Sequence, residues 1–133
     1  MKIEVSIGEV LDKITILQIK LEKIQDEDKL KHVRHELGVL EHRLNENNVS
    51  VPQEMLQELK EINLTLWETE DIIRDCEKNH DFGDEFVKHA RLDAQLNDKR
   101  FLIKNNRVQT CCLYDKWNSS IILLLKIPRD RSR

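Results

Sequence analysis

Histidine and cysteine are the side chains of this chain most able to hold a metal ion or act as nucleophiles. His32, His35 and His42 fall within one predicted helix, where two of them share a face. Metal binding needs a further ligand converging in a dry pocket, whereas these histidines have lysines and arginines as neighbours, which repel cations. Cys111 and Cys112 are adjacent and lack the two-residue spacing of zinc and redox pairs. We therefore predict no catalytic residue, metal site or cofactor.

Carboxylates offer a second route to chemistry, because Mg²⁺ binds a few of them together with water. Six acids fall in two consecutive predicted helices: Glu68, Glu70, Asp71 and Asp75 in one, and Asp93 and Asp98 in the next. All-helical nucleotide pyrophosphohydrolases hold magnesium with E-x-x-E on one helix and E-x-x-D on another. This chain does not reproduce that spacing, so we interpret the acids as a solvated helix face.

Composition limits the folds that could position these residues. The chain has 133 residues, 39% hydrophobic and 35% charged, with three glycines and two prolines, which suits one helical domain. No apolar run approaches the ~20 residues that span a bilayer. Three cysteines, an odd number, argue against a disulfide framework. We therefore expect a cytoplasmic protein without a transmembrane segment.

Charge is unevenly distributed along the chain. Residues 1–50 carry a net charge of −2, residues 51–98 a net −8 and residues 99–133 a net +7. A basic end can bind nucleic acid or an anionic surface, but no nucleic-acid motif accompanies it here. We expect the basic end to be solvated or to pair with the chain's own acidic middle.

The strongest structural signal lies between residues 3 and 24. Ser6 and Glu9 have the spacing of a capping box, in which each side chain accepts from the other's backbone N–H, and they predict a helix from Ile7 to Gln25. Six apolar residues occupy the a and d positions of successive heptads: Ile7, Val10, Ile14, Leu17, Leu21 and Ile24. Additional apolar residues widen this face, so we expect it to be contacted from two sides, and we predict a dimer.

Three further helices are predicted at about residues 28–46, 50–79 and 84–105. The helix at 50–79 is predicted to be capped by Ser50 and to use Leu59, Ile62, Leu66 and Ile73 as core residues. The core residues expected in the helix at 84–105 are Phe86, Val87, Ala90, Ala94, Leu96, Phe101 and Ile103. Short links join the helices, which favours antiparallel neighbours. The predicted fold is all-α, a four-helix antiparallel bundle with coiled-coil-like hairpins over residues 1–106 and a divergent, basic, partly apolar tail over residues 107–133. In that tail, the run I-I-L-L-L-K-I at residues 121–127 is too short to cross a bilayer. It is compatible with a strand, a last buried turn or an anchor on another surface.

An ordered set of short motifs resembles a family of short bacterial proteins. The set opens with I-E-V-S-I-G-E and D-K-I-T-I-L in the first helix and continues with Leu66-Trp67, Glu70-Asp71, Asp81-Phe82-Gly83, Ala90-Arg91 and Asn97-Asp98-x-Arg100. That family is an all-helical domain of unknown function, and the resemblance covers residues 2–104. It implies the fold and marks particular residues, but it implies no activity.

The resemblance marks polar residues that the apolar periodicity does not explain. On the third helix these are Trp67, Glu70, Asp71 and Arg74, which share one face, and on the fourth Arg91 and Asp98, seven residues apart, flanked by Asn97 and Arg100. The first helix adds Glu9, Asp12 and Lys13. If these three helices pack together, the residues could form an interhelical ion-pair network that fixes the register, which we favour. The alternative is a small anionic-ligand site with Arg91 and Arg100 as forked donors and Trp67 as its floor.

No motif in the sequence specifies a reaction. We therefore expect an interaction or assembly module, associating with itself or with another helical protein, rather than an enzyme. The alternative is a small helical enzyme or an anionic-ligand-binding protein that uses the polar residues between the first, third and fourth helices.

Overall fold

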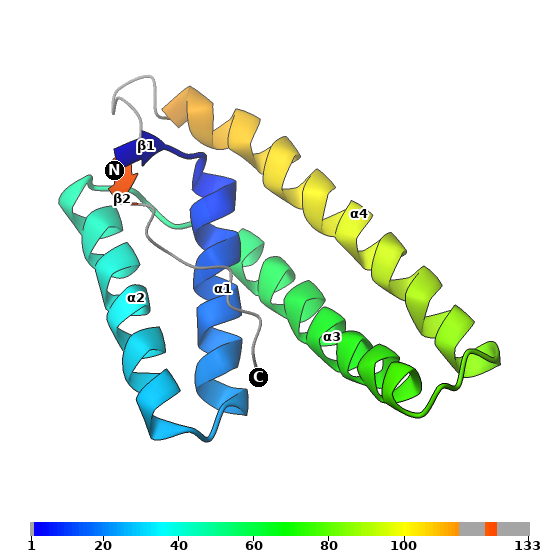
Figure 1. Cartoon of the computed structure of the whole chain (residues 1–133). Coiled ribbons are helices and arrows are strands. Elements are labelled where there is room, and N and C mark those ends of the chain that lie inside the picture. The colour runs from blue at the N-terminus through cyan, green and yellow to red at the C-terminus, as the bar shows by residue number, and fades with distance from the viewer. Residues whose placement is uncertain (1, 115–121, 125–133) are drawn as a thin grey trace.

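The computed structural model describes the backbone of residues 2–114 and 122–124 and the side chains of residues 5–105. The described chain is an all-α bundle of four helices with one short pair of strands (Figure 1). In chain order the elements are β1 (Lys2–Glu4), α1 (Ile7–Lys23), α2 (Glu27–Glu46), α3 (Gln53–Lys78), α4 (Asp84–Tyr114) and β2 (Ile122–Leu124). The predicted all-α helical bundle is confirmed.

The start of α1 follows from its sequence. Ser6 is the N-cap residue, and its hydroxyl accepts a hydrogen bond from the backbone N–H of Glu9 at 3.2 Å. This half of the predicted capping box is present, and it satisfies a backbone donor that has no partner within the helix. The other predicted cap, Ser50, is wrong, because α3 begins later, with Pro52 at its N-cap.

Helix α1 is the centre of the molecule. It packs against α2 on one side and against both α3 and α4 on the other (Figure 1). Its core residues are Ile7, Val10, Leu11, Ile14, Leu17 and Ile19, all buried. The expected contacts on two sides are therefore present. Because this face is covered by the chain's own helices, it cannot serve as the dimer surface on which the predicted dimer rested.

The α3–α4 hairpin turns at the predicted Asp81-Phe82-Gly83 motif. The Asp81 carboxylate accepts from the Gly83 N–H at 3.2 Å, and the Phe82 and Phe86 rings meet edge to face with centroids 5.3 Å apart. His80, two residues after the end of α3, has a φ of 53° and so lies in the left-handed conformation. Asp81 therefore closes the turn, and the motif has a structural role here.

Helix α4 departs from prediction in its length and its buried face. It continues to Tyr114 rather than ending near Asn105, because no proline or glycine interrupts it there. Val87, Ala94 and Phe101, expected in the core, are exposed. Leu96 is buried and Ile103 is half-buried, as expected, and half-buried His89 lies on the same face, seven residues before Leu96.

The apolar run near the C-terminus contributes a strand. Leu123 of β2 pairs with Ile3 of β1 in an antiparallel register, so of the three expected possibilities the described part, residues 122–124, is a strand. Most of the predicted tail lies outside the described residues. The division of the chain at residue 106 stays a prediction, and α4 runs across that boundary. Within the described residues, no helix is both long and apolar enough to cross a membrane.

Candidate functional site: a cavity between α1, α3 and α4

A cavity of about 230 Å³ lies where α1, α3 and α4 meet. Its lining combines charged, aromatic and aliphatic side chains: Glu9, Asp12, Lys13, Ile16, Ile19, Lys20, Asn63, Leu66, Trp67, Glu70, Arg74, Arg100 and Lys104. Five of these are cationic and three are carboxylates, so the walls carry an excess of positive charge.

The floor of the cavity is a buried, hydrogen-bonded polar group. The side-chain amide of Asn63, only 5% exposed, donates to Asp12 Oδ1 and to Thr15 Oγ1, both at 2.8 Å. Thr15 in turn donates its hydroxyl proton to the Asp12 backbone carbonyl at 2.7 Å. Buried polar groups are costly unless paired, and both donors of the Asn63 amide are paired here.

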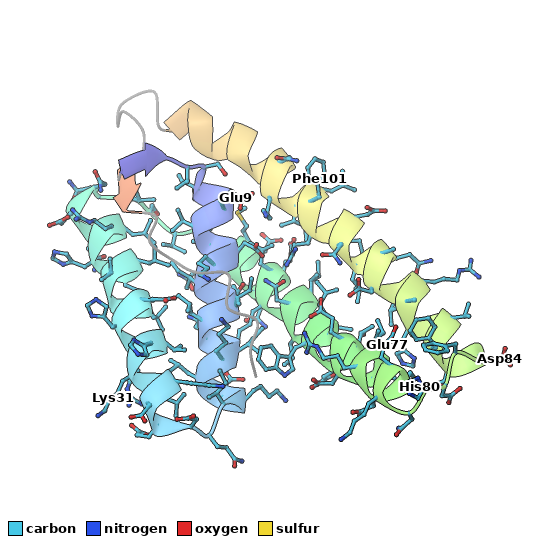
Figure 2. The ribbon with its side chains drawn as sticks, viewed as in Figure 1. Glu9, Lys31, Glu77, His80, Asp84 and Phe101 are labelled. Atoms are coloured by element: carbon cyan, nitrogen blue, oxygen red, sulfur yellow. The ribbon has the colours of Figure 1, made fainter. Side chains whose placement is uncertain are left out.

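Lys104 connects α4 to the first turns of α1. Its ammonium lies 2.9 Å from Glu9 Oε1 and 3.3 Å from Asp12 Oδ2, and its side chain is only 15% exposed. Glu9 therefore turns toward α4 in this structure; it lies in the first turn of α1 (Figure 2). One cation is thus shared between two carboxylates at this corner of the cavity.

Arg100 is held differently. Its guanidinium donates to Asn63 Oδ1 at 3.2 Å, which completes the bonding of that amide. Among the described residues, no carboxylate lies within ion-pair distance of Arg100. A guanidinium has five N–H donors, and toward the described residues this half-buried one directs one hydrogen bond, to a neutral acceptor. The cavity therefore contains a cation whose charge no described carboxylate neutralises directly.

The remaining wall is apolar and aromatic. Ile16 and Ile19 of α1 line the cavity together with Leu66 and Trp67 of α3. Arg74, which also lines it, has Glu70 at 3.9 Å and Asp71 at 3.7 Å on its own helix. The cavity can therefore offer a ligand both cationic donors and a flat apolar surface.

Residues 1–121 match a family of unknown function, DUF6165. The chain belongs to this family. The match confirms the predicted family and extends past the last quoted motif to include all of α4. No curated protein and no solved structure matches the chain.

The structure divides the eight predicted site residues into two groups. Four line the cavity: Trp67, Glu70, Arg74 and Arg100. Asp71 contacts Arg74 but does not line the cavity. The Asn97 side-chain amide donates to the Asp93 backbone carbonyl on its own helix at 3.0 Å. Arg91 and Asp98 are exposed and lie outside the cavity.

Helix geometry explains why Arg91 and Arg100 do not form one site. Nine residues correspond to about 2.5 turns of an α-helix, so the two guanidiniums leave α4 on opposite sides. Only Arg100 lies on the side that packs toward α1 and α3. The expected pair of forked donors is therefore reduced to one arginine, with Lys104 on the next turn.

Sequence reasoning missed the polar centre of the site. Asn63 stands four residues after Leu59 and three before Leu66, a core position in the α3 pattern, and the structure buries it where Ile62 was expected. A polar residue at a core position of the α3 pattern could have indicated that Asn63 is buried and hydrogen-bonded. Thr15 and Lys104 had no comparable signal, because their roles depend on neighbours from other helices.

The described histidine, cysteine and acidic side chains form no candidate metal site. No cluster of three or more histidine, cysteine or acidic side chains is placed to hold a metal among those residues. Burial raises the pKa of the Cys76 thiol, and the nearby carboxylates of Asp81, Glu85 and Asp75 raise it further. A raised pKa lowers the thiolate fraction, so Cys76 behaves as a small apolar core residue.

Proposed function

We propose that this protein binds a small anionic ligand in the cavity between α1, α3 and α4. The observation that carries the proposal is Arg100, a half-buried cation that donates to a neutral amide oxygen and has no carboxylate within ion-pair distance among the described residues. A cation so placed is best balanced by an anion from outside the chain. The excess positive charge of the lining also favours an anionic ligand.

The chemistry of the walls narrows the ligand class. A planar guanidinium recognises a carboxylate or phosphate through two parallel hydrogen bonds. Trp67, Ile16 and Leu66 would contact a ring or aliphatic part of the same molecule. The cavity of about 230 Å³ lies below the usual range for drug-sized ligands. The proposed ligand is therefore a small carboxylate or monophosphate with an apolar portion, bound without chemical conversion.

The proposal is tested with a panel of small carboxylates and monophosphates, screened by thermal shift and followed by calorimetry. Arg100→Gln should weaken the binding of any anion found in the screen at least tenfold, because it removes the positive charge and the paired N–H donors of the guanidinium. Lys99→Gln is the matched control, since it removes the same charge from the adjacent, exposed position on α4. Equal affinity of the two variants, or no binding by any anion in the panel, would contradict the proposal.

A second candidate function is self-association as an assembly module in the bacterial cytoplasm. The observation that supports it is the exposure of two large adjacent side chains on α4, Phe101 at 64% and Leu102 at 54%. Exposed apolar patches often mark protein interfaces. The partner is a second copy or another helical protein, joined by a coiled-coil-like contact. Sedimentation showing a monomer at all accessible concentrations would contradict self-association.

A further inference from the structure

The exposed side of α4 carries residues with the spacing of a coiled-coil seam. Val87, Arg91, Ala94, Asp98 and Phe101 follow one another at intervals of four, three, four and three residues, and all five are exposed. We call these five residues the outer stripe of α4. Such spacing keeps side chains on one face of a helix, where they can meet a partner helix.

The outer stripe faces away from the chain's own core. The buried or half-buried series of His89, Leu96 and Ile103 occupies the heptad position opposite that seam. Phe101 projects from α4 on the side away from α3 (Figure 2). A helix that packs on the outer stripe would therefore meet no obstruction from α1 or α3.

The order of residues in the stripe matches an antiparallel copy of itself. Val87 and Phe101 each lie seven residues from Ala94, while Arg91 lies three before it and Asp98 four after it. With Ala94 near a two-fold axis, Val87 would contact Phe101 of the partner subunit, and Arg91 would contact Asp98 of the partner subunit. A parallel pairing would instead place each charge beside its own like charge, which is unfavourable.

Two features of the described structure favour this arrangement. Neither Arg91 nor Asp98 forms an ion pair or hydrogen bond with any described residue, so both charges are available to a partner. Ala94 adds only a methyl group at the centre, which lets two helices approach closely. At the flank, the aliphatic stem of Lys88 would cover Leu102 of the partner subunit.

We propose that a second copy of this chain packs antiparallel on the outer stripe of α4, with Ala94 near the two-fold axis and Arg91 paired with Asp98 of the partner subunit. The interface is isologous, as two-fold interfaces of identical chains are. This inference rests on the proposed self-association and assigns it a surface, an orientation and a register.

The charge pair supplies the decisive test, with the dimer dissociation constant measured by sedimentation equilibrium. Arg91→Glu and Asp98→Lys should each weaken the dimer at least tenfold, because each places like charges together across the axis. The double variant Arg91→Glu/Asp98→Lys should return to within about threefold of the parent chain. Lys99→Glu is the control, since it reverses an exposed charge outside the stripe and should change little.

A crosslink tests the register independently. In a Cys111→Ser/Cys112→Ser background, Ala94→Cys should form an intermolecular disulfide under mild oxidation, because disulfides need Cα atoms within about 7 Å. Gln95→Cys at the neighbouring position should crosslink less, and Lys88→Cys should not crosslink. Crosslinking of Lys88→Cys with none at position 94 would overturn the register.

The outcomes separate this inference from the self-association on which it rests. A parent chain that stays monomeric contradicts both. A dimer that is unaffected by either single charge reversal and not restored by the double variant overturns the outer stripe as the interface, while self-association survives. Circular dichroism of each variant confirms folding, and substitutions at these exposed positions should leave the melting temperature nearly unchanged.

Discussion

Asn63 shows how a single polar residue can be tolerated in a helical core. Its amide joins three helices, donating to α1 at two points and accepting from Arg100 on α4. A buried amide is favourable only while its partners remain, since each lost hydrogen bond leaves a desolvated group unpaired. The residue therefore fixes how the three helices meet, and it also forms the floor of the cavity.

Asn63→Ala should lower the free energy of unfolding by about 2–3 kcal/mol, because Asp12 and Arg100 each lose a buried or half-buried partner. Urea denaturation measures the change. Thr65→Ala, at an exposed position two residues further along α3, is the control and should alter stability by less than about 0.5 kcal/mol. A similar small effect at both positions would show that the polar centre is not structural.

Burial of Cys76 should make the free energy of unfolding fall at alkaline pH. Its pKa is raised in the folded chain by burial and then by Asp81, Glu85 and Asp75, so folding favours the neutral thiol. The corresponding stability is present below the ordinary thiol pKa of about 8.5 and is lost as the pH rises through the raised value. Cys76→Ala should therefore show a smaller fall in unfolding free energy between pH 8 and pH 10 than the parent. A fall of equal size would contradict the assignment.

At the scale of elements, α1 stabilises the bundle because it is the helix that the other three contact. Leu11 and Leu17 have no exposed surface, and they lie on a helix covered from two sides. The sheet pairing between β1 and β2 is minor by comparison, with three residues in each strand. Stability should therefore depend on α1 more than on the chain's ends.

Leu17→Ala should cost about 2–5 kcal/mol of unfolding free energy, the usual range for a leucine removed from a packed core. Val39→Ala on α2, at a half-buried position, should cost clearly less. Chemical denaturation of the parent chain and both variants measures the loss of unfolding free energy, provided that the m-values agree. If the two losses were equal, α1 would not hold the central place that its packing indicates.

Removal of residues 111–133 should leave a helical bundle. The truncation deletes β2 and the last turn of α4, but it removes none of the described core side chains. The far-ultraviolet circular dichroism should remain helical, with a lowered but cooperative melting transition. A truncated chain that no longer folds would refute the predicted division into a bundle and a tail.

At the scale of the whole molecule, the proposed ligand site and the proposed dimer surface lie on opposite sides of α4. Arg100 points into the cavity, and Arg91, about 2.5 helical turns away, lies on the outer stripe. No described residue belongs to both surfaces. The two proposals are therefore physically independent and can both hold.

This independence predicts that ligand binding and dimerisation are uncoupled. The dimer dissociation constant should change less than about twofold when a bound anion saturates the cavity, because linkage requires differential affinity for monomer and dimer. Sedimentation equilibrium with and without ligand measures it. A large change in either direction would show that α4 moves when the cavity fills.

The number and approximate positions of the helices could be predicted from the amino-acid sequence. Capping at Ser6, apolar spacing and the scarcity of glycine and proline are local features, and they predicted four helices, although α3 begins later and α4 ends later than expected. The family motifs also include Trp67, Glu70 and Arg100, which line the cavity.

Which helix faces pack together could not be predicted from the sequence, because it depends on contacts between helices that are distant in the chain. Lys104 reaches Asp12 across 92 residues of chain, and Asn63 replaces an expected apolar neighbour in the core because the rotation of α3 places it there. Periodicity gives the faces of one helix relative to each other, but not which face a neighbouring helix covers. One side of α4 packs on α1 and α3, so Arg100 lies in the cavity and Arg91 is exposed. Which side of α4 is packed depends on how the three helices fit together.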